Sequence, residues 1–143
     1  MSADNTLKRL KQGVPAGAVL SRADAQAICE RVMRFSKADG IDVQVGSGHT
    51  TNVRFADNQM STAGALTDGQ LAVQSWFGPK HAVVTTNDFS EASLRRCVEQ
   101  SEVLARLAPD DPEAMPLLEP QQYVPVEAYF ESTAATDAAA RAR

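Results

Sequence analysis

The chain has 143 residues and a formal net charge of −4, with 43% hydrophobic and 22% charged residues. This composition is close to the globular average, which excludes wholesale disorder, a collagen-like repeat and a disulfide scaffold. The acidic balance argues against a nucleic-acid groove, because phosphate binding needs clustered Lys and Arg. No apolar run in the sequence approaches the ~20 residues that span a bilayer, and the first residues lack the apolar stretch of a secretory signal. We expect a cytoplasmic protein.

The first predicted elements are a polar lead-in over residues 1–20 and a helix over residues 21–38. Ser21 is a suitable N-cap, and Asp24 follows at the spacing of a capping box. Apolar residues then recur at helical spacing, at Ala25, Ile28, Cys29, Val32 and Phe35. Gly40 is expected to stop the helix, since a left-handed C-terminal cap carries no steric penalty when the residue is glycine.

Between residues 41 and 86 the hydrophobic period changes from 3.6 to 2, which predicts strands. The expected strands are residues 41–45, 51–55, 59–63, 70–77 and 81–86. Turns are expected at residues 46–48, 57–58, 64–69 and 78–79, where Gly, Pro, Asn and Asp supply turn chemistry. Strands this close together pair antiparallel, because a parallel crossover needs a dozen or more residues. The sequence therefore predicts an antiparallel meander sheet of about five strands.

A second helix is predicted to begin at Asp88 or Ser90 and to end before Pro109. Asp88 and Glu91 have capping-box spacing. The expected buried stripe consists of Leu94, Cys97, Val98, Ser101, Leu104 and Leu107. The outer face carries two i,i+4 ion pairs that we expect to be solvated, Glu91–Arg95 and Glu102–Arg106.

Five of the seven prolines lie between residues 109 and 126. This density excludes regular helix and central strand, and it predicts an extended arm over residues 109–131. Residues 132–143 predict a helix that begins near Thr136 or Asp137, has no C-terminal stop, and continues into a missing segment. The fold class is therefore α+β, with two helices packed on the sheet in a domain over residues 21–108, followed by the arm and a truncated helix.

The sequence offers no constellation of catalytic or metal-ligating residues. The two histidines, His49 and His81, lack metal-ligand spacing and suit ordinary polar strand positions. Cys29 and Cys97 lie on the apolar stripes of separate helices, where a thiol is normally inert. The adjacent carboxylates at residues 110–111 are expected in a solvated turn. We therefore expect no catalytic residue, no metal and no cofactor in this chain.

Trp76 and Phe77 are adjacent on a predicted strand, so one of them must face away from the core face. Trp76 is therefore a candidate contact with a partner or a neighbouring domain. The alternative is ordinary core packing.

Four sequence stretches together resemble one protein family. Residues 53–62, VRFADNQMST, are similar to the R-F-(S/A)-(N/D)-N-x-(I/M) hairpin in the first domain of the TldD/PmbA family. Three further stretches match in order: WFG at residues 76–78, TTND at residues 85–88 and LARLAPDDP at residues 104–112. The resemblance covers about residues 21–143.

The resemblance implies a cytoplasmic metallopeptidase, or a metal-free paralogue, that forms homo- or hetero-dimers and processes or degrades peptides and unfolded proteins. It implies zinc for the full-length protein, held by a His–Glu helix motif and a cysteine in the C-terminal part. No ligand is therefore carried over to this chain. Arg54, Asp57 and Asn58 match family markers and are, with Trp76, candidate partner or substrate contacts. For these three the alternative is turn and surface chemistry.

Two interpretations follow. In the first, the chain is the N-terminal domain or a fragment of such a metallopeptidase and serves assembly and substrate access; the reading frame would then continue past Arg143 into a His–Glu zinc helix. In the second, the chain is a non-catalytic protein-interaction module, a truncated paralogue that binds a full-length family member. A DNA-associated regulator, suggested by the older family name "modulator of DNA gyrase", is disfavoured because the sequence has no basic patch.

Overall fold

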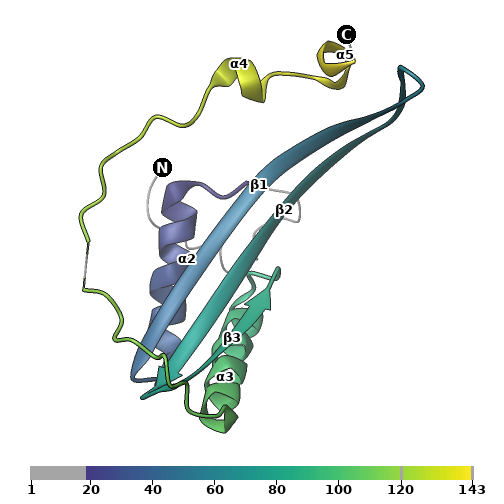
Figure 1. The fold of residues 1–143 in the computed structure, drawn as a ribbon. Coiled ribbons are helices and arrows are strands. Elements are labelled where there is room, and N and C mark those ends of the chain that lie inside the picture. Colours follow the sequence, from purple (N-terminus) through teal and green to yellow (C-terminus); the bar gives the residue numbers. More distant parts are fainter. Residues whose placement is uncertain (1–18, 120, 143) are drawn as a thin grey trace. The chain divides into compact units, whose positions relative to one another are not determined.

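The computed structural model describes residues 19–119 and 121–142 (Figure 1). Apart from its last two residues, the predicted lead-in lies outside this part of the chain. The described chain divides into two compact units. The core unit comprises residues 19–48 and 67–117, and the hairpin unit comprises residues 49–66 with the residues described between 118 and 142.

The helix predicted over residues 21–38 corresponds to α2 (Arg22–Phe35), which begins where the sequence predicts. The Ser21 hydroxyl accepts a hydrogen bond from the Asp24 backbone N–H, and the Asp24 carboxylate accepts one from the Ser21 N–H. This complete capping box satisfies two N–H groups that have no partner within the helix. The predicted cap is confirmed.

The C-terminal end of α2 differs from the prediction. The helix ends at Phe35, and Gly40 is the first residue of β1 rather than a left-handed cap. The physical reason is a cap from another helix: the Glu102 carboxylate accepts hydrogen bonds from the Ser36 hydroxyl and the Lys37 N–H. These contacts fix the end of the helix before the glycine is reached.

Within the described residues three strands, not the predicted five, form the sheet. They are β1 (Gly40–Ala56), β2 (Gln59–Phe77) and β3 (Lys80–Thr86), in the order β1-β2-β3. β2 and β3 pair antiparallel, with Ala72 opposite Thr85 and Trp76 opposite His81. The predicted α+β class with an antiparallel sheet is confirmed, and the strand number is corrected.

The two tight connections lie where the sequence predicts them. At the β1–β2 connection Asp57 and Asn58 have φ angles of 52° and 56°, as a two-residue hairpin turn with two left-handed positions requires. At the β2–β3 connection Gly78 has a φ of 57°.

The predicted turn at residues 46–48 and loop over residues 64–69 are wrong, because β1 and β2 continue through them. Two of the glycines involved allow close packing instead. A Cβ atom at Gly69 would lie 2.9 Å from the ring of Phe89, and one at Gly64 would lie 2.6 Å from Oδ1 of Asn52. A glycine in a strand-like sequence indicates either an interruption of the strand or a position where another group packs closely against the backbone. Only the three-dimensional structure distinguishes the two cases.

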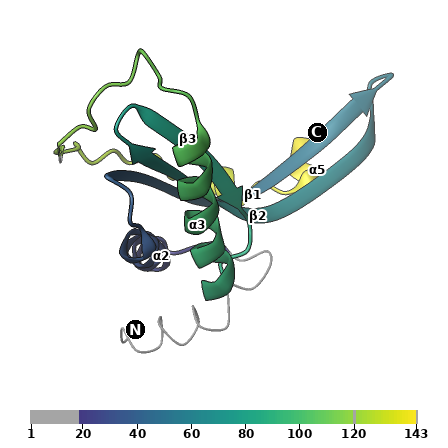
Figure 2. The same ribbon diagram turned by 90° about the horizontal axis from the view of Figure 1, so that it is seen from below.

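The core lies between one face of the sheet and the two helices (Figure 2). The second helix, α3 (Glu91–Leu107), has Ser90 as its N-cap, whose hydroxyl accepts from the Ser93 N–H. On β2, Leu71, Val73 and Ser75 alternate as buried residues and point to the helices. The buried hydrophobic cluster consists of Ile28, Val32, Leu71, Val73, Phe89, Leu94, Cys97 and Val98.

The last turns of α3 correct two further expectations. Leu104 and Leu107, predicted to be buried, are 49% and 78% exposed. Glu102, predicted on a solvated face, is only 6% exposed, and Ala105 is fully buried. Glu102 faces inward and caps α2, and Ala105, three residues later, lies on the same inner face of α3, whereas Leu104 faces outward.

Beyond α3, the described residues between Ala108 and Phe130 contain no helix or strand. The extended arm itself remains a prediction. Two short helices follow, α4 (Glu131–Ala134), which the sequence did not predict, and α5 (Ala138–Arg141). The side chain of Asp137 accepts from the Ala140 N–H, so α5 begins where a helix start is expected.

Candidate functional site

The three family-marker residues lie at the end of the hairpin unit. Arg54 is near the end of β1, and Asp57 and Asn58 form the turn; all three are exposed. The left-handed conformation of the turn residues explains why Asp and Asn occur there, since both tolerate positive φ. A role of these residues in partner or substrate contact remains a prediction.

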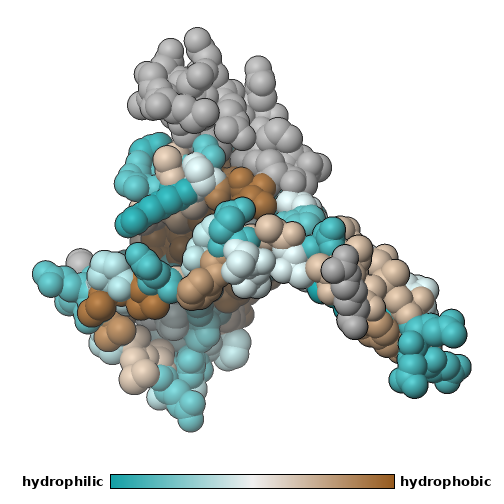
Figure 3. Space-filling model, turned by 90° about the horizontal axis from the view of Figure 1, so that it is seen from above, coloured by the Kyte–Doolittle hydropathy of each residue, from teal (hydrophilic) through white to brown (hydrophobic). Residues whose placement is uncertain are grey.

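The same hairpin exposes two apolar side chains that the sequence did not indicate as candidate contact residues. Phe55 is 50% exposed and Met60 is 46% exposed. Figure 3 shows apolar surface on the hairpin unit, with hydrophilic atoms at its end. The signal that could have revealed them is the two-residue turn, because it places residues 55 and 60 opposite each other.

Trp76 lies in the core unit and faces away from the helices. Its ring stacks on that of His81, with the centroids 4.3 Å apart and the planes 29° from parallel. The neighbouring Phe77 lies under the guanidinium of Arg106, at 4.0 Å from the ring centroid. Trp76 is half-buried, and a contact with a partner remains a prediction.

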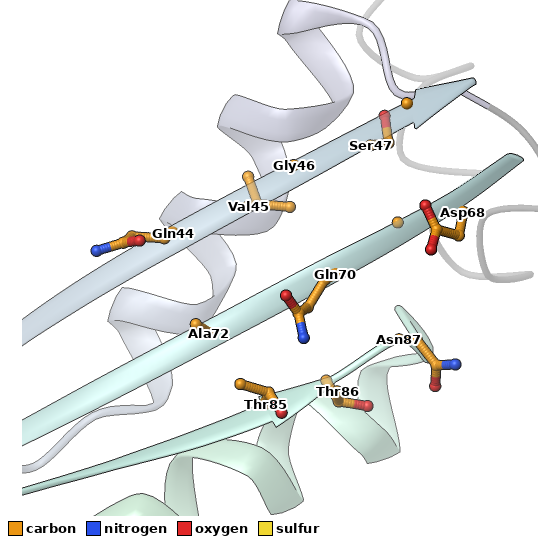
Figure 4. A pocket seen from close by; sticks show the side chains of 12 residues that line it. Gln44, Val45, Gly46, Ser47, Asp68, Gln70, Ala72, Thr85, Thr86 and Asn87 are labelled. Atoms are coloured by element: carbon orange, nitrogen blue, oxygen red, sulfur yellow. The ribbon is translucent and has the colours of Figure 1, made fainter. Parts of the chain in front are cut away.

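The open face of the sheet, opposite the helices, carries a hollow of about 760 Å³ that the sequence did not predict. Gln70 extends from β2 toward β3, and Thr85 on β3 is opposite Ala72 (Figure 4). The lining consists of Gln44, Val45, Gly46, Ser47, Gly48, Asp68, Gly69, Gln70, Ala72, Thr85, Thr86 and Asn87. Because the small residues leave room over the backbone, amide and hydroxyl groups border an open space.

This lining suits a polar ligand that donates and accepts hydrogen bonds. Among the described residues, the side chains of Asp68, Gln70 and Thr85 make no hydrogen bond or ion pair with the protein. Amide, hydroxyl and carboxylate groups together match peptide groups and other uncharged polar groups. The sequence could not reveal this site, because the β2–β3 register decides which residues share it.

β1 leaves one sheet edge unpaired, because the strand order among the described residues is β1-β2-β3. Within the core unit, five consecutive β1 residues, 44–48, also line the hollow. The backbone groups of an unpaired edge are a template for pairing with an extended chain. The edge and the hollow are therefore adjacent features of the same strand.

The described residues do not fit a zinc site. Among residues 19–119 and 121–142, no three His, Cys, Asp or Glu side chains lie close enough together to hold a metal ion. Burial raises the pKa of both thiols, Cys29 and Cys97, above the ordinary value of 9.0, which disfavours the thiolate that a nucleophile or a metal ligand requires.

The carboxylates at residues 110–111 differ from each other. Asp110 is exposed and lies 3.9 Å from the Lys80 ammonium. Asp111 begins a turn, as expected, since its carbonyl oxygen accepts from the Ala114 N–H. Its carboxylate is half-buried, however, and lies 3.8 Å from Nδ1 of His81, so it is less solvated than expected. In the part of the chain that the structure describes, no helix has the length and hydropathy needed to cross a membrane.

Comparisons with known proteins are consistent with this fold. Residues 41–105 match a family model described as PmbA/TldA metallopeptidase domain 1. The structure is similar to the crystal structure of TldE from Thermococcus kodakarensis, with a TM-score of 0.58 and 16% sequence identity. The match covers 71% of this chain and 23% of TldE, so this chain corresponds to under a quarter of that protein. No curated protein sequence matches.

Proposed function

We propose that the chain is the N-terminal part of a TldD/PmbA-like metallopeptidase, because residues 41–105 match the model of that family's first domain. The proposed activity of the whole protein is the processing or degradation of peptides and unfolded proteins in the cytoplasm. This activity comes from the family, since the likeness to TldE supports the fold alone.

In this proposal the chain serves assembly and substrate access rather than chemistry. The observation that carries this role is the edge of β1 with which no strand of the described residues pairs; it lies next to the polar hollow, which residues 44–48 help to line. An extended peptide can add to such an edge through backbone hydrogen bonds. A long polar side chain of such a peptide could then extend over the open face of β1 toward Gln70 on β2.

Zinc belongs, in this proposal, to a part of the full-length protein outside the matched residues. The proposed partner is a second TldD/PmbA-type subunit, in a homo- or hetero-dimer. The predicted arm over residues 109–131 would lead from this domain to the next. The role proposed for this chain, which is to give the substrate access, requires no metal ligand from β1 or β2.

The test is an NMR titration of the 143-residue chain with an unstructured 15-residue peptide. We expect the amide signals of residues 41–48 to shift or broaden, and those of α3 to stay unchanged. The variant Gln70→Ala should weaken binding about two- to tenfold, because one lost hydrogen bond contributes about 0.5–1.5 kcal/mol.

The matched control is Glu99→Ala/Gln100→Ala on the exposed side of α3, which should leave the affinity unchanged. Absence of binding, or binding that maps to α3, would contradict the role in substrate access. Sedimentation with a full-length TldD/PmbA subunit tests assembly separately. A stable complex that leaves peptide cleavage unaffected would favour the non-catalytic interaction module.

A further inference from the structure

The segment that follows α3 crosses the end of the sheet where β2 turns into β3 (Figure 1). We define residues 108–117 as the strap. The Asp111 N–H donates to the carbonyl oxygen of Pro79 at 3.1 Å. At the far end of the strap, Leu117 reaches the sheet: a Cβ atom at Gly40 would lie 2.7 Å from its Cδ1 atom.

The side-chain attachment of the strap runs through His81. Nδ1 of His81 lies 3.8 Å from Oδ2 of Asp111, which is an ion-pair distance and too long for a hydrogen bond. Nδ1 is buried and has no hydrogen-bond partner among the described residues. The stacked ring of Trp76, 4.3 Å away, holds the imidazole in place. A buried nitrogen therefore faces a carboxylate without bonding to it.

The charge of the imidazole decides what this contact contributes. A neutral imidazole presents either an N–H or a lone pair at Nδ1, whereas an imidazolium presents an N–H at both nitrogens. An imidazolium would attract the carboxylate of Asp111, and a closure of about 1 Å would give a charge-assisted hydrogen bond. Its positive charge would also be favoured by the face of the Trp76 ring.

The other charged groups at this end of the sheet do not cancel that attraction. Lys80, on the same strand, opposes a positive His81, but its ammonium lies 3.9 Å from Asp110. The remaining groups are Asp39, whose carboxylate accepts from the Gly78 N–H, and Arg106, which lies over the Phe77 ring. Glu113 adds a further negative charge on the strap.

We propose that His81 and Asp111 form a pH-sensitive latch that holds the strap to the sheet more tightly when the imidazole is protonated. Histidine is the side chain whose charge ordinarily changes between pH 5 and 8, while a carboxylate ordinarily stays ionised over that range. As the pH falls from 8 to 5.5, the latch strengthens. The segment that leads away from the domain is then bound more firmly. This inference rests on the core unit alone and is independent of the proposed function.

The test is amide hydrogen exchange of the whole 143-residue chain at pH 5.5 and pH 8.0, corrected for the intrinsic pH dependence of exchange. The amide of residue 111 should be better protected at pH 5.5 by a factor between about 1.5 and 5, which corresponds to the 0.2–1 kcal/mol of a partly exposed ion pair. His81→Gln removes the group that becomes positively charged, and Asp111→Asn removes the negative charge. Each variant should reduce this factor to about 1.

Two controls separate the latch from general effects of pH. Lys80→Gln should retain the pH dependence, because Lys80 is not part of the His81–Asp111 contact. The amides of Leu71 and Val73 in the core should show no change of protection specific to the two latch variants. An equal pH response in the wild type and in both latch variants, or weaker protection at pH 5.5 in the wild type, would overturn the proposal.

Discussion

The hydroxyl oxygens of Ser75 and Ser101 lie 2.7 Å apart and join β2 to α3 inside the core. Both residues are fully buried. Ser101 also donates to the carbonyl oxygen of Val98 at 2.9 Å. Either hydroxyl could donate in this pair, but each has only one proton, so Ser75 is the donor to Ser101 while Ser101 donates to Val98. Ser75 therefore depends on Ser101 for its bond, whereas Ser101 keeps its bond to Val98 without Ser75.

This asymmetry predicts unequal effects of the two alanine substitutions. Ser101→Ala should lower the free energy of unfolding by about 1–3 kcal/mol, because it leaves a buried donor without a partner. Ser75→Ala should lower it by only about 0.5–1 kcal/mol, and the double variant should be more stable than Ser101→Ala alone. Urea unfolding of the three variants measures this. A larger effect of Ser75→Ala would show that the direction of the bond is reversed.

The buried carboxylate of Glu102 predicts a second effect on stability. Its bonds to Ser36 and to the Lys37 N–H cap the end of α2, and it also lies 3.6 Å from Arg106. Glu102→Ala should destabilise the chain by about 1.5–3 kcal/mol, the range for hydrogen bonds to charged groups. The same urea titration measures the loss.

The chain offers two comparisons for this residue. Glu99→Ala, at an exposed position of the same helix, should change stability by less than about 0.5 kcal/mol. Glu102→Gln keeps an acceptor oxygen and should lose less than Glu102→Ala. If glutamine and alanine at residue 102 were equally destabilising, the capping bonds would not be the cause.

Local chemistry explains which features could be predicted. The helix cap at Ser21 is recognised from Asp24, three positions away, and the hairpin turn is recognised from its own two residues, Asp57 and Asn58. Each of these features can therefore be predicted from a few neighbouring residues. Glu102 caps a helix end 65 residues away, and its spacing to Arg106 is that of an ordinary surface pair. Such contacts depend on how helices and strands pack against one another, and this packing cannot be inferred from a short stretch of sequence.

The candidate site shows the same limit. The polar character of Gln70 and Thr85 is visible in the sequence, but their common face depends on the β2–β3 register. The hollow also needs β1 to continue straight through residues 46–48. Because the sequence predicts a turn at those residues, it predicts two short strands instead of one continuous β1, and the lining of the hollow is not apparent. The family markers at the hairpin were recognisable because they are contiguous.

The thiols of Cys97, which is buried, and Cys29, which is half-buried, predict a dependence of stability on alkaline pH. Burial raises the pKa of Cys97 and of Cys29 above the ordinary 9.0, and the Cys97 thiol donates to the Val84 carbonyl at 3.4 Å. The unfolded chain therefore loses these protons at lower pH than the folded chain. Their stabilising contribution is complete below about pH 9 and is lost as the pH rises through the raised pKa.

Urea midpoints between pH 8 and pH 10.5 check this effect. The wild type should lose stability over that range more steeply than Cys29→Ala/Cys97→Ala, although the double variant starts from a lower value because alanine leaves a cavity. Parallel curves for the two proteins would contradict the prediction, since the remaining titrating groups are common to both.

Gly69 and Gly46 provide a matched pair of glycine substitutions within the same sheet. A Cβ atom at Gly69 would lie 2.9 Å from Cε2 of Phe89, a buried ring that cannot move without disturbing the core. At Gly46, by contrast, no atom of residues 19–119 or 121–142 lies within 4 Å of such a Cβ. Gly69→Ala should therefore destabilise the chain by about 1–3 kcal/mol through overpacking. Gly46→Ala should be neutral or stabilise it by up to about 1 kcal/mol, because the unfolded chain loses freedom. Urea unfolding measures both, and equal effects at the two positions would show that contact with Phe89 is not what requires glycine.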